Sequence, residues 1–262
     1  MTATMQPSPH NDGRLVGSDR VLAVLVELAR HHEGTTLDDI AQNIEGSKPT
    51  VHRALASLCR AGLAQQDARG HYVLGDEFLR MAFTHHAARP DHLRIQPILE
   101  RLAERTGETT HYAVLDGRSI VYRAKVDPTR GSMRLTSTIG GRNPAHTTGV
   151  GKLLLAYALR SEDDIHEWIG DRPLERPTDR SITAVEAMHA EFQLIRERGY
   201  ALDDQENEMG VNCVALPYFR TSSTVPDGGV SISGIAHRTR IEDLVNDLPA
   251  LRHIVEGQAK RA

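Results

Sequence analysis

The sequence predicts a two-domain α+β protein, in which a winged helix-turn-helix precedes a larger domain that packs helices against a sheet. Three observations lead to this prediction. Residues 36–60 read as two short amphipathic helices joined by a tight turn, and residues 63–75 follow them as a β-hairpin. Beyond residue 107 the pattern changes to strands mixed with helices. The length of 262 residues and the hydrophobic content of 39% suit two compact globular domains.

The helix-turn-helix is expected to begin with a capped amphipathic helix. Thr36 is a suitable N-cap, and Asp39 three residues later completes a capping-box pattern. Apolar residues then recur at helical spacing, and Gly46 suits the left-handed backbone conformation that ends a helix. An earlier helix, capped by Ser18, completes a three-helix core with the apolar residues Val21, Leu22, Leu25 and Leu28.

The second helix of the motif carries the residues that are expected to meet DNA. Ser47 is placed to cap it, and Pro49 falls in its first turn, where a missing N–H is tolerated. Its buried stripe leaves Arg53 on the opposite face, although an amphipathic helix with no role in DNA binding would show the same pattern. The hairpin that follows favours DNA binding. In a winged helix-turn-helix the recognition helix meets base edges, while the wing touches the backbone or the minor groove.

Arg53 is expected to be the principal base reader, because a guanidinium pairs bidentately with guanine. Other contacts to bases, phosphates or the minor groove are expected from Ser47, Lys48, Thr50, Ser57 and Arg69. The net charge of −4 gives no global basic signature, but residues 47–72 hold four basic residues against one acidic residue, an excess of 4 − 1 = +3. The expected partner is therefore double-stranded DNA, held with a modest electrostatic attraction.

Composition disfavours several other classes of protein. Residues 1–13 are polar and read as a disordered arm rather than a signal peptide, and no apolar run of about 18 residues predicts a transmembrane helix. The two cysteines lie in different expected domains, so no disulfide framework is expected and the setting is taken as cytoplasmic. The fourteen histidines lack metal-ligand spacing, so no metal is expected.

The domain layout follows from these patterns. We expect the arm over 1–13, the winged helix-turn-helix over 14–75, a linker helix over 76–90 and the second domain over 91–262. The helix of residues 76–88 either completes the first domain or acts as a linker and dimer contact with its apolar residues Phe78, Leu79, Ala82 and Phe83.

The second domain is expected to open with a helix from Asp91 to Gly107 that carries Leu93 on its apolar face. A hairpin follows around the turn at Asp116-Gly117. The expected strands are 110–115, 119–126, 133–138, 211–219 and 230–236, and the expected helices are 149–159, 184–199 and 241–257, the last interrupted or started at Pro249.

Motifs for catalysis or cofactor binding fail one by one. A P-loop at Gly151-Lys152 lacks its first glycine and its hydroxyl residue, and a dinucleotide fingerprint that starts at Gly149 meets Leu154 where glycine is required. A nucleophile elbow at Ser231 has Ser233 in place of its second glycine. No catalytic residue, cofactor or enzymatic activity is therefore expected.

A binding constellation remains. Gly149 and Val150 open an apolar helix, and the free backbone N–H groups of a helix start can hold a carboxylate or phosphate oxygen. The other candidates follow in turns and buried strands: Asp203, Cys213, Ser231 and Ser233. The alternative is that Asp203 caps a loop and the serines satisfy backbone groups.

The sequence resembles the IclR family of bacterial transcriptional regulators over nearly the whole chain, from about Val16 to Gly257. The resemblance rests on the joint order of TTLDDIAQNIEGSKPTVHRALASLCRAGL, QDARGHYVLG, AHTTGVGKLLLAY, GYALDDQENEMGVNCVALPYF and VSISGIA. It implies an N-terminal winged helix-turn-helix, a linker helix and a C-terminal effector domain of GAF-like α/β form. It also implies homodimers, often paired into tetramers, that bind palindromic operators, commonly of catabolic operons, and respond to small organic acids.

Carried over residue by residue, the resemblance places the effector against the backbone of Gly149 and Val150, surrounded by Asp203, Cys213, Ser231 and Ser233. Two departures from the family are expected near the rim of this site: Tyr218-Phe219, where members often have a small residue, and the polar segment 221–229. Two other classes stay open from the residues alone. One is a constitutive DNA-binding protein whose second domain only oligomerises, and the other is an enzyme with an accessory DNA-binding domain.

Overall fold

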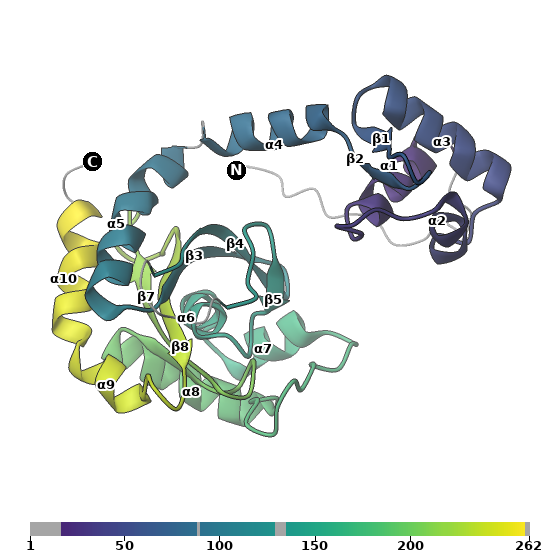
Figure 1. The fold of residues 1–262 in the computed structure, drawn as a ribbon. Coiled ribbons are helices and arrows are strands. Elements are labelled where there is room, and N and C mark those ends of the chain that lie inside the picture. The colour runs from purple at the N-terminus through teal and green to yellow at the C-terminus, as the bar shows by residue number, and fades with distance from the viewer. Residues whose placement is uncertain (1–16, 88–89, 129–134, 260–262) are drawn as a thin grey trace. The chain divides into compact units, whose positions relative to one another are not determined.

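The computed structural model of the chain describes residues 17–87, 90–128 and 135–259, so the expected arm of residues 1–13 lies outside the described residues. The chain divides between residues 88 and 89 into two compact units (Figure 1). Each unit has its own apolar core, which is the property that defines a domain.

The first unit is a helix-turn-helix followed by a wing. It contains α1 (Gly17–Leu28), α2 (Leu37–Asn43), α3 (Lys48–Arg60), β1 (Ala64–Gln66), β2 (Tyr72–Leu74) and α4 (Asp76–Ala87). The two strands pair as an antiparallel hairpin. The apolar faces of α1, α2 and α3 close on one another and on the hairpin, in a core that includes Val24, Ile40, Leu55 and Tyr72.

The ends of α2 and α3 agree with expectation in one detail and differ in two. The capping box is confirmed, because the Thr36 hydroxyl accepts the Asp39 N–H and the Asp39 carboxylate accepts the Thr36 N–H. The left-handed residue after α2 is Glu45, with φ of 52°, rather than Gly46. Ser47 stands at the N-cap of α3 without capping it, because its hydroxyl bonds to a side chain one turn further on.

The face that α1 buries is rotated from the expected one. Val24 and Leu28 are buried, whereas Leu22, expected in the core, is 59% exposed. Nearly every residue between 21 and 28 is apolar, so helical spacing alone does not select one face. Packing against α3 makes that selection.

α4 buries little of its apolar face within the first unit. Phe78 is half-buried, but Leu79, Ala82 and Phe83 are exposed, Phe83 at 68%. None of these four residues belongs to the apolar core of the first unit, although the helix groups with that unit.

The second unit is built on a six-stranded antiparallel sheet with the order β5-β4-β3-β8-β7-β6. Its strands are β3 (Thr109–Asp116), β4 (Ser119–Val126), β5 (Arg142–Pro144), β6 (Ala201–Asp204), β7 (Val211–Tyr218) and β8 (Gly228–Ile235). Its helices are α5 (Pro90–Thr106), α6 (Gly149–Ala158), α7 (Glu162–Ile169), α8 (Val185–Arg198), α9 (Ile241–Asn246) and α10 (Leu248–Ala259).

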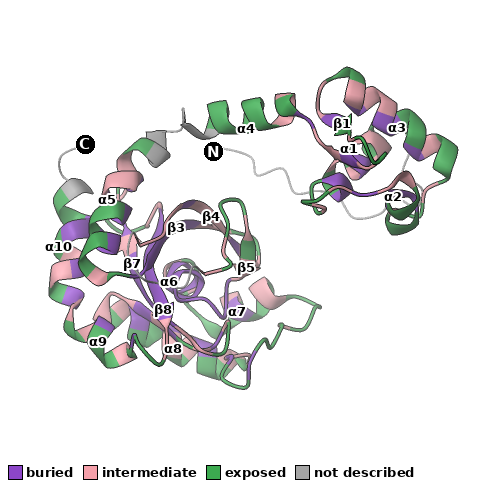
Figure 2. Cartoon of the chain, in the orientation of Figure 1, coloured by how far each residue is buried: buried purple, intermediate pink, exposed green. Residues whose placement is uncertain are grey.

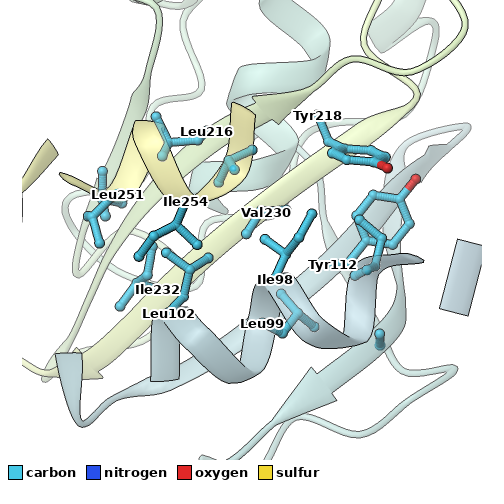
Figure 3. Close-up of a cluster of buried hydrophobic side chains, with 14 of the residues drawn as sticks. Ile98, Leu99, Leu102, Tyr112, Leu216, Tyr218, Val230, Ile232, Leu251 and Ile254 are labelled. Atoms are coloured by element: carbon cyan, nitrogen blue, oxygen red, sulfur yellow. The ribbon is translucent and has the colours of Figure 1, made fainter. Parts of the chain in front are cut away.

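Side chains along each strand alternate between the two faces of the sheet, and each face contributes to an apolar core. Helices cover both faces and complete these cores. One core joins the sheet to α5, α9 and α10 and includes Leu99, Tyr112 and Leu216 (Figure 3). The other joins it to α6 and α8 and includes Ala113 and Leu153. α6 is buried over most of its length (Figure 2), so its N-terminus lies inside the unit.

Some elements of the second unit differ from expectation. Of the strand expected over 133–138, residues 133–134 lie outside the described residues and 135–138 form no strand. Instead, β5 pairs with residues 119–121 of β4. The sequence around residue 135 does not predict this pairing. The strand β6 and the helix α7 were not predicted. The C-terminal helix is interrupted at Asp247, so Pro249 falls in the first turn of α10, and Leu93 on α5 is exposed.

No helix among the described residues is long and apolar enough to cross a membrane. Nor do residues 17–87, 90–128 and 135–259 contain a group of three or more His, Cys, Asp or Glu side chains arranged to hold a metal ion.

Candidate DNA-binding surface and effector cavity

The exposed face of α3 carries a continuous series of hydrogen bonds between candidate side chains. The hydroxyls of Ser47 and Thr50 are 2.8 Å apart, and Arg53 Nη2 donates to Thr50 Oγ1 at 3.5 Å. One turn further on, Ser57 Oγ donates to the Arg53 carbonyl at 3.0 Å. No carboxylate of the described residues pairs with Arg53, so its guanidinium is available to a base edge.

Lys48 and Arg69, the other candidate cations, are each paired with a carboxylate. Lys48 Nζ is 2.7 Å from Asp38 Oδ2, and in the wing Arg69 Nε donates to Asp67 Oδ2 at 3.0 Å. Both pairs are exposed and screened by solvent, so a phosphate can replace the carboxylate at small cost. Asp67 also fixes the wing turn, because it accepts the backbone N–H groups of Arg69 and His71.

Arg60, counted among the basic residues of this region but not singled out as a contact to DNA, lies on the same surface. Its Nη2 donates to Ser57 Oγ at 2.9 Å, and its side chain is exposed. It follows Arg53 by two helical turns, as helical spacing predicts for residues on one face. The exposed face of α3 therefore presents two arginines in one row.

The N-terminus of α6 leaves two backbone N–H groups unengaged. Thr148 caps the helix by accepting the Gly151 N–H at 3.1 Å. Within the described part of the chain, the N–H groups of Gly149 and Val150 donate to no acceptor. The helix also packs tightly on the preceding loop, since a Cβ at Gly151 would overlap the carbonyl group of Ala145. A carboxylate at this end would meet two free donors and the positive end of the helix dipole.

Three strands bring the other candidate residues to this helix end. Asp203 on β6 pairs in register with Cys213 on β7, which pairs with Ser233 on β8, and Ser231 follows on the same face of β8. Gly149 lies against this row, because a Cβ there would be 3.2 Å from Cys213 Sγ and 3.7 Å from Asp203 Cβ. The register of the sheet thus assembles residues that lie far apart in the chain.

A cavity of about 230 Å³ lies between α6 and the sheet. Of the six candidate effector residues, it is lined by Gly149, Val150, Asp203, Cys213 and Ser231. Ser233 is buried beside Cys213 and is not part of the lining. The cavity suits a small acid better than a drug-sized ligand, whose sites span about 300–1,000 Å³.

Asp203 is the principal titratable group of the cavity. Burial raises the pKa of Asp203 to about 7, although the charge of Lys152 and the bound backbone N–H groups lower it. Its Oδ1 accepts the N–H of Glu206 at 2.7 Å and that of Asn207 at 3.3 Å, so the loop-capping role that the sequence allowed is present as well. Burial also raises the pKa of the Cys213 thiol to about 12, which leaves it neutral and unsuited to act as a nucleophile.

Lys152, one turn into α6, takes part in a buried ion pair. Its ammonium contacts Glu206 Oε1 and lies 3.6 Å from Glu191 Oε1. Burial raises the pKa of Glu206, and the ammonium of Lys152 opposes that shift. These carboxylates compensate the charge of Lys152, and Arg142, a cation that lines the cavity, is paired with Asp116. Among the described residues, the N–H groups at the N-terminus of α6 are therefore donors that no carboxylate already engages.

Sequence reasoning missed His111, Tyr122 and Asn143, which also line the cavity. His111 faces the cavity because it pairs in register with Ser231 across β3 and β8, and such a pairing is not visible in either strand alone. Asn143 Nδ2 donates to the Tyr122 hydroxyl at 3.2 Å. The available signal was a histidine beside the apolar residues Tyr112 to Leu115 of the strand.

The two departures expected near the rim of this cavity lie elsewhere, so that expectation was wrong. Tyr218 packs in the core with α5 and α10, where its ring meets that of Tyr112 edge-on at 5.8 Å. Phe219 and the first residues of the polar segment line a separate cavity of about 620 Å³. Their position in the sequence suggested that they lie near Cys213. However, Cys213 is near the start of β7, whereas Tyr218 ends the strand and the other residues follow it.

This combination of a helix-turn-helix with an α/β domain that encloses a small polar cavity defines a bacterial transcriptional regulator. Residues 18–68 match the IclR helix-turn-helix domain, and residues 92–257 match the bacterial transcriptional regulator IclR C-terminal domain. The chain belongs to the IclR family, as its sequence motifs predicted. It is therefore a DNA-binding transcriptional regulator rather than an enzyme.

Relatives with similar sequences or structures span most of the chain. It is 33% identical over 227 residues to the HTH-type transcriptional regulator BhcR of Paracoccus denitrificans, covering 86% of this chain and 79% of BhcR. A solved putative transcriptional regulator from Rhodococcus sp. RHA1 is 31% identical, with a TM-score of 0.78 over 92% of this chain and 95% of that one. An IclR homologue from Microbacterium hydrocarbonoxydans, solved in complex with 4-hydroxybenzoate, shares the fold at 22% identity, with a TM-score of 0.78 over 93% of this chain and 98% of that one.

Proposed function

We propose that this regulator binds a palindromic operator as a homodimer, and that a small organic acid in the α6 cavity controls that binding. The observation that carries the proposal is the pair of unengaged N–H groups at Gly149 and Val150 in a cavity that also contains Asp203. The carboxylate of an acid would accept from both N–H groups, and protonated Asp203 would donate a further hydrogen bond to it. Cys213 and Ser231 complete the wall of this subsite.

The operator is read by the exposed face of α3. Arg53 pairs with a guanine in the major groove, because its guanidinium is held along the helix and is not neutralised by a carboxylate. The remaining contacts, to bases or phosphates, come from Ser47, Lys48, Thr50 and Ser57. Arg69 exchanges its wing carboxylate for the DNA backbone or enters the minor groove.

Dimerisation is supported by apolar side chains that the first unit leaves exposed. Leu22 and Val26 lie four residues apart on α1 and are 59% and 58% exposed, and Leu79, Met81 and Phe83 are exposed on α4. A palindromic operator requires two recognition helices about 34 Å apart, so the proposed dimer has to hold its two α3 helices at that spacing. The family resemblance extends the assembly to a dimer of dimers.

Effector control requires that the acid bind one spacing of the two recognition helices better than the other. A preference of about 100-fold corresponds to about 2.7 kcal/mol. α4 joins the two units in sequence and is the element through which such a change would pass. The regulated genes are those that metabolise the acid, and the protein acts in the cytoplasm, where the bacterial chromosome lies.

Fluorescence anisotropy with a duplex from the region upstream of the gene tests the DNA-binding part. Wild type, Arg53→Ala and Arg60→Ala are titrated at two salt concentrations against the native and a scrambled duplex. Arg53→Ala should lose about 1–3 kcal/mol of discrimination, whereas Arg60→Ala should weaken both duplexes alike and lower the salt dependence. Equal, steeply salt-dependent binding of both duplexes by the wild type would leave only phosphate attraction and contradict specific readout.

The same assay tests effector control when organic acids are added to the operator complex. At least one acid should change the operator affinity more than tenfold, and Asp203→Ala should remove that change while leaving the affinity without acid intact. If no acid alters operator binding and none shifts the unfolding temperature, the constitutive DNA-binding protein is the better account.

A further inference from the structure

A second cavity of about 620 Å³ lies in the second unit, where β7 ends beside α10 (Figure 1). Residues 216–223, the C-terminal ends of α6 and α8, and α10 line this β7 cavity. None of the described residues lines both the β7 cavity and the α6 cavity. The volume of the β7 cavity falls within the range of about 300–1,000 Å³ that is typical of small-molecule sites.

One side of the β7 cavity is aromatic and aliphatic. The rings of Tyr157 and Phe219 both line it, meet edge to face at 5.7 Å and are half-buried. Leu216 and Val255 of the buried core add aliphatic surface. This wall suits the aromatic body of a ligand, because rings gain free energy from burial and from edge-on or offset contacts with other rings.

Three arginines line the β7 cavity, and carboxylates neutralise two of them. Arg198 Nη2 lies 2.9 Å from Glu191 Oε1, and Arg220 Nη2 lies 3.5 Å from Asp227 Oδ1. Among the described residues, no carboxylate pairs with Arg252. Arg252 is therefore the cation of this cavity that is available to an anionic ligand.

The guanidinium of Arg252 is held at the wall of the cavity. Its Nη2 donates to the carbonyl of Arg198 at the end of α8, and a Cβ at Gly199 would lie 3.2 Å from the same nitrogen. Arg198 and Gly199 both line the cavity. A guanidinium has five N–H donors in a planar fork, so donors remain after the Arg198 carbonyl is satisfied. Such a fork matches the two oxygens of a carboxylate.

Two glutamates limit the charge that the β7 cavity accepts. Glu197 and Glu256 line it, and both side chains are exposed. Their negative charges repel an anion, and the repulsion is larger for a phosphate monoester than for a singly charged carboxylate. The cavity therefore suits one carboxylate attached to an apolar body.

The polar loop on the other side of the cavity is fixed by Asp227. Its carboxylate accepts the N–H groups of Arg220 at 2.8 Å and Thr221 at 2.9 Å, and the Thr221 hydroxyl at 2.7 Å. The Asp227 N–H donates to the Tyr218 carbonyl at 2.9 Å. A wall that is already ordered loses little conformational freedom when a ligand binds.

We propose that the β7 cavity is a second ligand site of this regulator, which takes an aromatic monocarboxylic acid. The carboxylate pairs with Arg252, and the ring lies against Tyr157 and Phe219. The inference does not depend on the acid proposed for the α6 cavity, because the two cavities share none of the described residues.

Isothermal titration calorimetry of the full chain with three matched compounds tests the inference. The probes are 2-naphthoate, its neutral amide 2-naphthamide, and the more highly charged 2-naphthyl phosphate. The wild type should bind 2-naphthoate about tenfold more tightly than either of the others, as expected for one charge-assisted contact. Arg252→Gln should remove the preference over the amide, because glutamine keeps a donor for the Arg198 carbonyl but carries no charge.

Three further variants assign the binding to this cavity. Arg220→Gln is the matched control, since it removes an arginine that Asp227 already neutralises, and it should keep the preference. Phe219→Ala should weaken 2-naphthoate and 2-naphthamide alike, by about tenfold, and it tests the site without disturbing the end of α8. Asp203→Ala, in the α6 cavity, should leave the binding of all three compounds unchanged.

Circular dichroism and thermal unfolding establish which variants are folded. The inference is overturned if the wild type binds none of the compounds, or if neither Arg252→Gln nor Phe219→Ala weakens 2-naphthoate. Loss of binding in Asp203→Ala also overturns it, because the ligand then occupies the α6 cavity. A Phe219→Ala protein that loses the wild-type oligomer in analytical ultracentrifugation would instead make this face a contact between copies of the chain.

Discussion

Replacing Asp203 with asparagine should abolish a pH dependence of effector binding that the wild type shows between about pH 6 and pH 8.5. Burial raises the pKa of Asp203 to about 7, so this side chain changes from neutral to ionised across that range. An acid bound at Gly149 and Val150 would place its carboxylate against Asp203, and ionised Asp203 would repel it. The affinity should therefore be highest below pH 7 and fall as the pH rises through 7.

The size of the effect follows from the protonated fraction of Asp203. If only the protonated form binds the acid, the apparent Kd equals the intrinsic Kd divided by that fraction. With a pKa of about 7, the fraction is ~0.9 at pH 6 and ~0.03 at pH 8.5, so binding weakens ~30-fold, or ~2 kcal/mol. The asparagine amide keeps an oxygen for the Glu206 and Asn207 N–H groups and can donate to the acid at every pH.

Isothermal titration calorimetry measures this dependence at three pH values and constant ionic strength. The ligand is the organic acid that changes the operator affinity most. Glu206 also has a pKa raised by burial and shares Lys152 with Asp203, so Glu206→Gln is the control. It should keep the pH dependence but move its midpoint to lower pH, because the charge of Glu206 contributes to the raised pKa of Asp203. His111 and Cys213, with pKa values of about 3 and about 12, do not titrate in this range. A flat wild-type profile, or an unchanged slope in Asp203→Asn, would refute the reasoning. A slope lost only in Glu206→Gln would assign the titration to that residue.

Three further changes test the fold and the assembly. Gly151→Ala should lower the free energy of unfolding in urea by about 1–3 kcal/mol, because its Cβ overlaps the carbonyl of Ala145, whereas Gly257→Ala, with open space around it, should be neutral or stabilising. Lys152→Met should cost about 3–5 kcal/mol in the same titration by leaving a buried carboxylate without its cation, and wild-type stability would contradict that role of the ion pair. Leu22→Lys should preserve the circular dichroism spectrum but shift the protein towards monomers in analytical ultracentrifugation, and an unchanged dimer would place the contact elsewhere.

The sequence by itself determined the elements whose causes lie close together in the chain. The capping box at Thr36, the wing hairpin and the hairpin around Asp116-Gly117 depend on residues within a few positions of one another, and all are present. Apolar runs located α6, α8 and the buried strands β7 and β8. The joint order of these segments was enough to identify the family.

Predictions from local sequence patterns were wrong where several conformations fit the same pattern equally well. In α1 nearly every residue between 21 and 28 is apolar, and packing against α3 turns Val24 inward and Leu22 outward. Glu45 rather than Gly46 adopts the left-handed conformation, although glycine pays less to do so. The strand that pairs with β4 is β5, which lies against residues 119–121. The apolar residues near position 135 predicted a different strand.

The candidate effector site shows the same division. A helix start with free N–H groups is readable from the glycines of residues 149–151, because its donors come from consecutive residues. Only the sheet register places Asp203, Cys213 and Ser231 opposite that helix and adds His111 to the same wall. Burial then sets their protonation states, raising the pKa of Asp203 and lowering that of His111. Desolvation depends on everything that packs around a group, so tertiary structure alone decides which of these residues carries a proton for the ligand.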